Sequence, residues 1–506
     1  MKRPLLRRLA LLAGAAITLL LLAPVQARPV DEDLLNILLE NGSITSSQHK
    51  ELVAKLNDED VPTEQPSVAT QSTAESPAES PAQDSTTAVD SKLFETEISG
   101  SELDEKIAQE VAIQVDAATP VKSSHGSKGF RLETADGNWQ TNLQWRAQLR
   151  YTNPTTGDPR QLSNFTDDNQ STFEARRLRM KIGGHGYRPW LKYYFELDLQ
   201  PTRDTDDSSA SASTRVIDWR IDVDKWDWGG FRVGQWKIDY NRERVDSSGR
   251  QQFVERSIIN RVFTVDRQVG VQLRGHAFKD TRADLRWYVG AFTGEGRGVR
   301  GTDENLMYVG RLQWNFLGRD LGLRQTDVEF TELPTASFAV GASTVIGACT
   351  RWSSSGCGNL DGFTSPGNAA NDQFKVEQAV QEFAYKWRGL SVQQEFHYKE
   401  ITDRLADTKS RLTGGYAQAG YFFHNLFPAF PEPLELAVRY AYLEEPNATD
   451  LNFENERQEF TVAANWFFRG HNNKLTFDVS RLRLEDDFFN QNESESRARL
   501  QWDISF

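Results

Sequence analysis

The residues of this chain best suited to chemistry are basic side chains gathered in one stretch, Asn241–Arg267. A guanidinium group stays charged, and its planar fork can donate two hydrogen bonds to two oxygens of one phosphate. The stretch lies between two segments of alternating polarity, Phe231–Ile238 and Gln268–Gly275, which predicts a long loop between strands. Two interpretations are open: the arginines face water, or the loop folds into a pore where its charges meet anions. The candidate anion-contacting residues here are Lys237, Arg242, Arg244, Arg250, Arg256 and Arg261.

A second basic row lies on a predicted strand. Arg177, Arg179 and Lys181 alternate with apolar residues, so all three project from one face. An arginine facing lipid at mid-bilayer would cost about 2–4 kcal/mol, which directs this face towards a wet lumen. The same argument gives Arg146, Arg220 and Arg274 lumenal positions. The alternative for each is a structural ion pair with a nearby Asp or Glu.

Alternation of polar and apolar residues recurs from residue 130 to residue 506. About sixteen such segments are joined by connections that are long and short in turn, as in outer-membrane barrels. Residues 317–334 are an exception, because they are too long for an ordinary periplasmic turn. A water-soluble all-β protein is the alternative, but it would need a second sheet to cover the charged faces. We therefore predict a 16-stranded antiparallel transmembrane β-barrel over residues 130–506, with a small helical N-terminal periplasmic extension.

The first 129 residues have a different composition. Residues 1–27 have the basic, apolar and small-residue regions of a cleaved signal peptide. Residues 28–60 predict a helical hairpin, and residues 61–100, rich in Pro, Ser, Thr and acids, predict a disordered linker. Residues 101–129 predict a short helix, with a coiled-coil pattern of barely two heptads, and a connector; an amphipathic or largely disordered periplasmic segment is the alternative. Residues 28–120 could bind peptidoglycan or another periplasmic partner.

Other patterns limit the function. After export, Cys349 and Cys357 are expected to form a disulfide, with two free thiols as the alternative. We expect no nucleic-acid partner, and the formal net charge of −14 does not argue against an anion site. The histidines lack metal-ligand spacing, and neither a phosphate-binding glycine loop nor a nucleophile–base pair is supported. We expect no enzyme activity, no metal and no cofactor; an outer-membrane hydrolase would need the missing nucleophile–base pair.

Several segments resemble the phosphate-selective porin family, the porin O and P type of Gram-negative outer membranes. They are Phe173–Gly184, Val233–Ser248, Phe253–Gly275, Trp287–Gly296 and the closing RLQWDISF. The resemblance implies a homotrimeric barrel, an inward-folded third loop and passive uptake of phosphate or related small anions along basic side chains. The C-terminal Phe506 resembles the terminal aromatic signal for barrel assembly.

The expected surroundings are the lipid bilayer and lipopolysaccharide of the outer membrane. Two alternatives to a phosphate channel stay open. One is a general or differently selective porin. The other is a structural anchor that tethers the envelope through its N-terminal helices.

Overall fold

The computed structural model describes Lys50 and residues 121–155, 170–199, 214–299, 301, 304–353, 356–360, 362–446, 454–486 and 491–506. The expected signal peptide, helical hairpin and linker lie outside these residues, apart from Lys50, and so does the short helix predicted after residue 101. Residues 121–126, which we expected to belong to the connector, form a strand. None of the described helices is long and apolar enough to cross a membrane.

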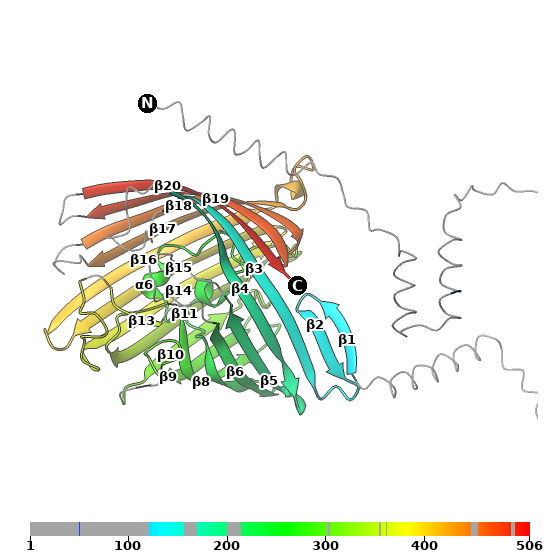
Figure 1. Cartoon of the computed structure of the whole chain (residues 1–506), viewed down its shortest axis with the longest axis horizontal. Coiled ribbons are helices and arrows are strands. Elements are labelled where there is room, and N and C mark those ends of the chain that lie inside the picture. The colour runs from blue at the N-terminus through cyan, green and yellow to red at the C-terminus, as the bar shows by residue number, and fades with distance from the viewer. Residues whose placement is uncertain are drawn as a thin grey trace, which may run out of the picture. The chain divides into compact units, whose positions relative to one another are not determined.

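Sixteen antiparallel strands form a closed barrel, which confirms the fold predicted from the alternation of polar and apolar residues (Figure 1). The barrel strands are β3 (Gln140–Thr155), β4 (Gln170–Gly186), β5 (Arg188–Asp198), β6 (Arg215–Trp226), β7 (Gly229–Lys237), β8 (Arg267–Ala277), β9 (Leu285–Phe292), β10 (Met307–Trp314), β11 (Thr335–Gly347), β14 (Phe374–Trp387), β15 (Leu390–Asp403), β16 (Thr408–Tyr421), β17 (Leu434–Pro446), β18 (Glu454–Arg469), β19 (Asn473–Asp486) and β20 (Gln491–Ser505). Each strand pairs with the barrel strands before and after it in sequence, and the last pairs with the first.

The seam between β20 and β3 closes the barrel. Ser505 lies opposite Arg146 in this antiparallel pair. The last residue, Phe506, extends the pairing, because its N–H donates to the Trp145 carbonyl oxygen at 2.9 Å and its carbonyl oxygen accepts from the Trp145 N–H at 3.1 Å. The C-terminal residue is therefore part of the barrel wall.

A hairpin of β1 (Val121–Gly126) and β2 (Gly129–Thr134) continues this wall beyond the end of β20. β2 pairs with the first half of β3, where Phe130 lies opposite Leu143. Gly129 is required at the junction, since its φ is +81° and a Cβ would lie 2.1 Å from the Leu143 carbonyl oxygen. The hairpin lies beside the C-terminus in Figure 1.

The two ends of the barrel carry different connections. At the end with Phe506, called the turn end, most connections are short, such as residues 388–389 and 470–472. One of them, residues 422–433, contains the short helix η2 (Phe423–Asn425). The exception is residues 315–334, called T4. The opposite end is called the loop end.

Two connections at the loop end contain structure of their own. Residues 238–266, called L3, contain the short helices α5 (Arg242–Val245) and α6 (Asn260–Phe263). Residues 348–373, called L5, contain a small hairpin of β12 (Arg351–Ser353) and β13 (Gly356–Gly358). Figure 1 shows α6 within the ring of strands.

The polarity of the two barrel faces reverses along β15, β16, β17 and β19. Near the turn end the inward side chains are polar: Glu395, Gln418, Glu435 and Lys474. Near the loop end the inward side chains are apolar and join a buried cluster with α6 and L5: Ile401, Leu412, Leu443 and Leu482. The outward neighbours of that second group are charged: Glu400, Arg411, Glu444 and Arg481. L3 and L5 therefore give the loop end an apolar core like that of a water-soluble protein.

Candidate functional site

L3 is fixed to one wall of the barrel by carboxylates that project from the strands. They accept hydrogen bonds from backbone N–H groups of the loop: Glu395 of β15 from Glu243 at 2.6 Å, Glu459 of β18 from Ile258 at 2.9 Å and Asp478 of β19 from Val254 at 3.0 Å. Near the turn end, Lys474 of β19 donates to the Gln251 carbonyl oxygen. L3 thus runs down this wall almost to the turn end, and these four of its backbone groups are paired with strand side chains.

The opposite wall leaves a cavity of about 1120 Å³ between the barrel strands, L3 and T4. Basic side chains from all three surround it, including Arg179, Lys181, Arg250, Arg324 and Lys386. Acids such as Glu196, Asp222 and Asp246 also line it. The cavity is therefore charged with both signs, and its preference depends on which charges already have partners.

Two of the candidate cations hold L3 in shape. The Lys237 ammonium group donates to the carbonyl oxygens of Arg244 at 3.1 Å and Asp246 at 2.9 Å, at the C-terminal end of α5. The Arg256 guanidinium donates to the carbonyl oxygens of Glu243 at 2.8 Å and Asp246 at 2.7 Å. Both charges are directed at the last carbonyl oxygens of a helix, where cations stabilise the helix end, so these two residues have a structural role.

The other four candidate arginines of L3 have different environments. Arg242 is fully buried and donates to Gln393 Oε1 at 3.1 Å and to the Gly322 carbonyl oxygen. Arg244 forms an ion pair with Asp266. Arg261 is half-buried in α6, while Arg250 is exposed at the turn-end part of the loop and lines the cavity.

Three of the candidate strand arginines form ion pairs with acids of the barrel strands. Arg179 contacts Glu196 at 2.9 Å and Asp198 at 3.6 Å. Arg220 contacts Asp222 at 3.3 Å and stacks over the Tyr194 ring, and Arg274 contacts Asp224 at 2.9 Å. On this wall the aspartates neutralise much of the basic charge.

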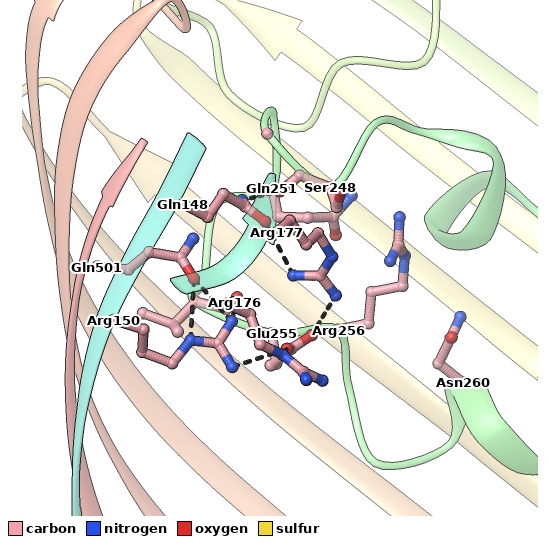
Figure 2. A network of polar contacts seen from close by, with 12 residues as sticks. Gln148, Arg150, Arg176, Arg177, Ser248, Gln251, Glu255, Arg256, Asn260 and Gln501 are labelled. Atoms are coloured by element: carbon pink, nitrogen blue, oxygen red, sulfur yellow. Dashed lines mark hydrogen bonds and ion pairs between the residues drawn. The ribbon is translucent and has the colours of Figure 1, made fainter. Parts of the chain in front are cut away.

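A cluster around Glu255 of L3 joins the loop to β3 and β4 (Figure 2). The Glu255 carboxylate contacts Arg150 at 2.8 Å, Arg176 at 3.1 Å and Arg177 at 3.5 Å. Arg177 also donates to Gln148 Oε1 at 2.9 Å. Sequence reasoning missed Arg176, because strict alternation directs it outward. A β-bulge between Arg177 and Ala175 in the register of β4 turns it inward, and the run of two arginines is a weak signal for such a bulge.

Three candidate cations have no carboxylate within 4.0 Å among the described residues. Arg146 donates to the Ser247 and Ser248 hydroxyls at 2.9 and 2.6 Å, and Lys181 donates to Gln144 Oε1 at 3.3 Å. Arg250 has no carboxylate within 4.0 Å in the part of the chain that the structure describes. Lys181 is repelled by Arg146 and Arg250 and attracted by Glu196, so the three cations lie in one region that also holds an acid. We call them the basic trio.

T4 folds inward and meets L3 from the turn end, which sequence reasoning did not predict. Gln325 accepts from the Gln252 N–H at 2.8 Å and donates to Gln251 Oε1 at 2.9 Å. Arg324 lies near the basic trio: burial first, and then the charge of Arg250, lower the pKa of the Arg324 guanidinium. Arg324 also forms an ion pair with Glu329 of T4. The unusual length of T4 was the available signal, but its partners in L3 lie 73 residues away.

L5 covers α6 from the loop end. Cys349 and Cys357 form a disulfide with a Cα–Cα distance of 5.6 Å. β12 packs against α6, and Trp352 Nε1 donates to the Gly294 carbonyl oxygen at 2.6 Å. Within the described ranges, no group of three His, Cys, Asp or Glu side chains could hold a metal ion.

Comparisons with known proteins identify the family. The family model for phosphate-selective porin O and P matches residues 151–504. The search of curated proteins gives no match. The chain is similar in structure to OmpT, an outer membrane protein of Vibrio cholerae, at 9% identity over 72% of this chain and 97% of that one, with a TM-score of 0.46. It is also similar to the outer membrane channel DcaP of Acinetobacter baumannii, at 12% identity over 72% of this chain and 97% of that one, with a TM-score of 0.47. A third similar structure is an anion-selective porin from Comamonas acidovorans, at 10% identity over 72% of this chain and 99% of that one, with a TM-score of 0.43.

The family match covers most of the chain and almost the whole closed barrel. The protein is therefore a passive porin channel of a Gram-negative outer membrane and not an enzyme. The chain belongs to the phosphate-selective porin O and P family.

Proposed function

We propose that this porin passes small anions, with phosphate as the preferred one. The observation that carries the proposal is the basic trio. None of Arg146, Lys181 and Arg250 has a carboxylate within 4.0 Å among the described residues, whereas cations nearby, such as Arg179 and Arg274, are held by carboxylates. A cation without a carboxylate partner keeps its attraction for a passing anion.

The two loops that meet at the cavity support this proposal. Arg250 comes from L3 and Arg324 from T4, so basic side chains approach the cavity from both loops. Arginine can donate two hydrogen bonds to one phosphate, which favours a multivalent oxyanion over chloride. Because acids such as Asp246 lie in the same cavity, each site is weak. Weak sites in series suit conduction, since an anion that enters one site must leave for the next.

The test is ion conduction by the full chain in planar bilayers. The reversal potential in a KCl gradient gives the sign of the selectivity, and titration with phosphate measures block of the chloride current. Cation preference, or no conduction, would contradict the anion channel. Anion preference without any block by phosphate would leave an anion porin but reject phosphate as the preferred ion.

Two variants locate the site. Lys181→Gln and Arg250→Gln each remove one unit charge, and at about 4 Å in a water-like lumen that charge is worth about 1 kcal/mol to an anion. We expect phosphate block to weaken about five-fold in each variant. Arg411→Gln, which removes an outward charge paired with Glu400, is the control and should leave the block unchanged.

We also propose that the mature chain begins after Ala27 and that three barrels assemble together. The N-terminal residue pattern supports the first, and family membership supports the second. Intact and native mass spectrometry of the purified protein test both. A retained leader, or a monomer in every mild detergent, would reject the corresponding proposal.

A further inference from the structure

The outer face of β19 changes from apolar to basic near the loop end. Its outward side chains run Leu475, Phe477 and Val479, and then Arg481 and Arg483. Their inward neighbours at the same level, Leu482 and Leu484, are buried. In an outer-membrane barrel the long loops face the exterior, so the two arginines lie at the outer-leaflet edge of the lipid-facing band.

Aromatic side chains on the neighbouring strands mark that edge. Arg481 lies opposite Phe460 of β18, and Phe460 lies opposite Tyr440 of β17. Both rings are about half exposed on the outer face, at 49% and 48%. A girdle of aromatic residues marks the interface between lipid tails and headgroups. The guanidinium of Arg481 is therefore level with lipid headgroups.

A groove of about 330 Å³ joins these residues on the outer face. It is lined by Tyr440, Gln458, Phe460, Arg481, Arg483 and Ser494. Its apolar rings come from β17 and β18, and its basic groups come from β19. The groove therefore has an apolar part and a positive part, as an amphipathic ligand requires.

The charge of Arg481 is held by neutral groups. Its guanidinium donates to the Ser496 hydroxyl at 2.9 Å and to the Ser494 hydroxyl. Arg483 forms an ion pair with Glu485, and its side chain is 52% exposed. Among the residues with described side chains, no carboxylate lies within 4.0 Å of Arg481. The two serines thus fix its orientation without neutralising it.

We propose that this groove binds the phosphorylated headgroup of a lipopolysaccharide molecule in the outer leaflet. Arg481 donates to the headgroup phosphate, Arg483 stands beside it, and an acyl chain lies against Phe460 and Tyr440. The placement at the interface also lowers the energetic cost of exposing an arginine on the outer face of the barrel. An arginine on the lipid face costs about 2–4 kcal/mol at the midplane but little near the interface, where it can meet phosphate. The site is separate from the lumen and does not depend on the proposed anion selectivity.

Binding of lipopolysaccharide to the full chain, first stripped of lipid in detergent, tests the proposal. Native mass spectrometry counts bound lipid across a titration, and dephosphorylated lipopolysaccharide is titrated in parallel. We expect Arg481→Gln with Arg483→Gln to weaken binding about tenfold, because two charge-assisted contacts to phosphate are lost. The matched control is Arg131→Gln with Lys279→Gln, which removes the same charge from exposed sites at the turn end and should bind like the unaltered protein.

The lipid comparison on the unaltered protein gives a result even when the double variant does not fold. Phosphorylated lipid should bind about tenfold more tightly than its dephosphorylated form. Equal binding of the two forms would overturn the proposal, and so would equal binding by the folded double variant and the control. Displacement of the lipid by millimolar inorganic phosphate would also overturn it, since the groove would then be a site for free phosphate.

Discussion

Replacing Glu255 by glutamine should make the channel more anion-selective and loosen L3. The Glu255 carboxylate contacts Arg150, Arg176 and Arg177 (Figure 2), while Glu174 lies farther from Arg150 and Arg176, at 3.8 and 3.9 Å. Glutamine has nearly the same shape and can still accept a hydrogen bond. The substitution therefore removes the charge and leaves the packing almost unchanged.

The magnitude follows from the burial of the cluster. Removing one partner of a buried ion pair costs about 3–5 kcal/mol. Glu255 is 23% exposed, and Arg150 and Arg177 keep hydrogen bonds to Gln501 and Gln148. We therefore expect a loss of stability near the lower end, about 3 kcal/mol. These residues do not line the cavity described above. For an anion that passes within about 4 Å of the cluster, the lost negative charge would be worth about 1 kcal/mol, or about a five-fold gain in occupancy.

Two measurements on the Glu255→Gln channel separate these effects. The reversal potential in a KCl gradient should move towards that of chloride, and trypsin should cleave within L3 at lower concentration than in the unaltered protein. Glu400→Gln serves as the control, because Glu400 is an outward acid paired with Lys409 and Arg411. A variant with unchanged selectivity and unchanged cleavage would refute the view that Glu255 sets the charge and position of L3.

Three further changes test other parts of the lumen. Replacing both Cys349 and Cys357 by serine removes a disulfide across a sequence separation of 8 residues, which is worth about 2.5 kcal/mol by loop entropy. Amide hydrogen exchange in L5 should then accelerate. Unchanged exchange would contradict the view that the disulfide stabilises L5. Burial raises the pKa of the Asp246 carboxyl, so it loses its negative charge at a higher pH than an ordinary aspartate as the pH falls. Anion preference should therefore rise as the pH falls, from a higher pH than an ordinary aspartate would give. An Asp246→Asn channel with the same pH response would exclude this carboxyl as the cause. Gln325→Ala leaves the Gln252 N–H without its acceptor, at a cost of about 1–3 kcal/mol. The looser contact between T4 and L3 should increase the noise of the single-channel current. Unchanged noise would show that T4 does not hold L3 in place.

Alternation of side chains made most of the barrel predictable. On β4 the lumenal row is set by a period of two, which holds wherever a strand is regular. It failed at Arg176, because a bulge adds one residue and reverses the direction of the next. A bulge depends on pairing with β3, and that pairing cannot be read from β4 alone.

The basic loop was predictable as a feature, but the roles of its residues were not. A loop that enters a barrel must satisfy its carbonyl and N–H groups without the help of bulk water. Lys237 and Arg256 meet this need at the end of α5, and so their charges are directed at carbonyl oxygens. Composition alone cannot distinguish these structural cations from Arg250, which lines the cavity, because the role of each side chain depends on where the loop turns.

The reversal of polarity towards the loop end links these observations to conduction. Leu443 and Leu482 alternate with polar residues as lipid-facing side chains do, yet they face inward and pack with α6. The sequence could not distinguish the two faces there, because the apolar partner is supplied by L3 and L5. That core fills the loop end along β15 to β19, and the strand carboxylates fix L3 to the same side. The cavity borders the other wall, where acids neutralise most of the arginines. Selectivity should therefore follow the few cations there that lack carboxylate partners, and not the total count of basic residues in the lumen.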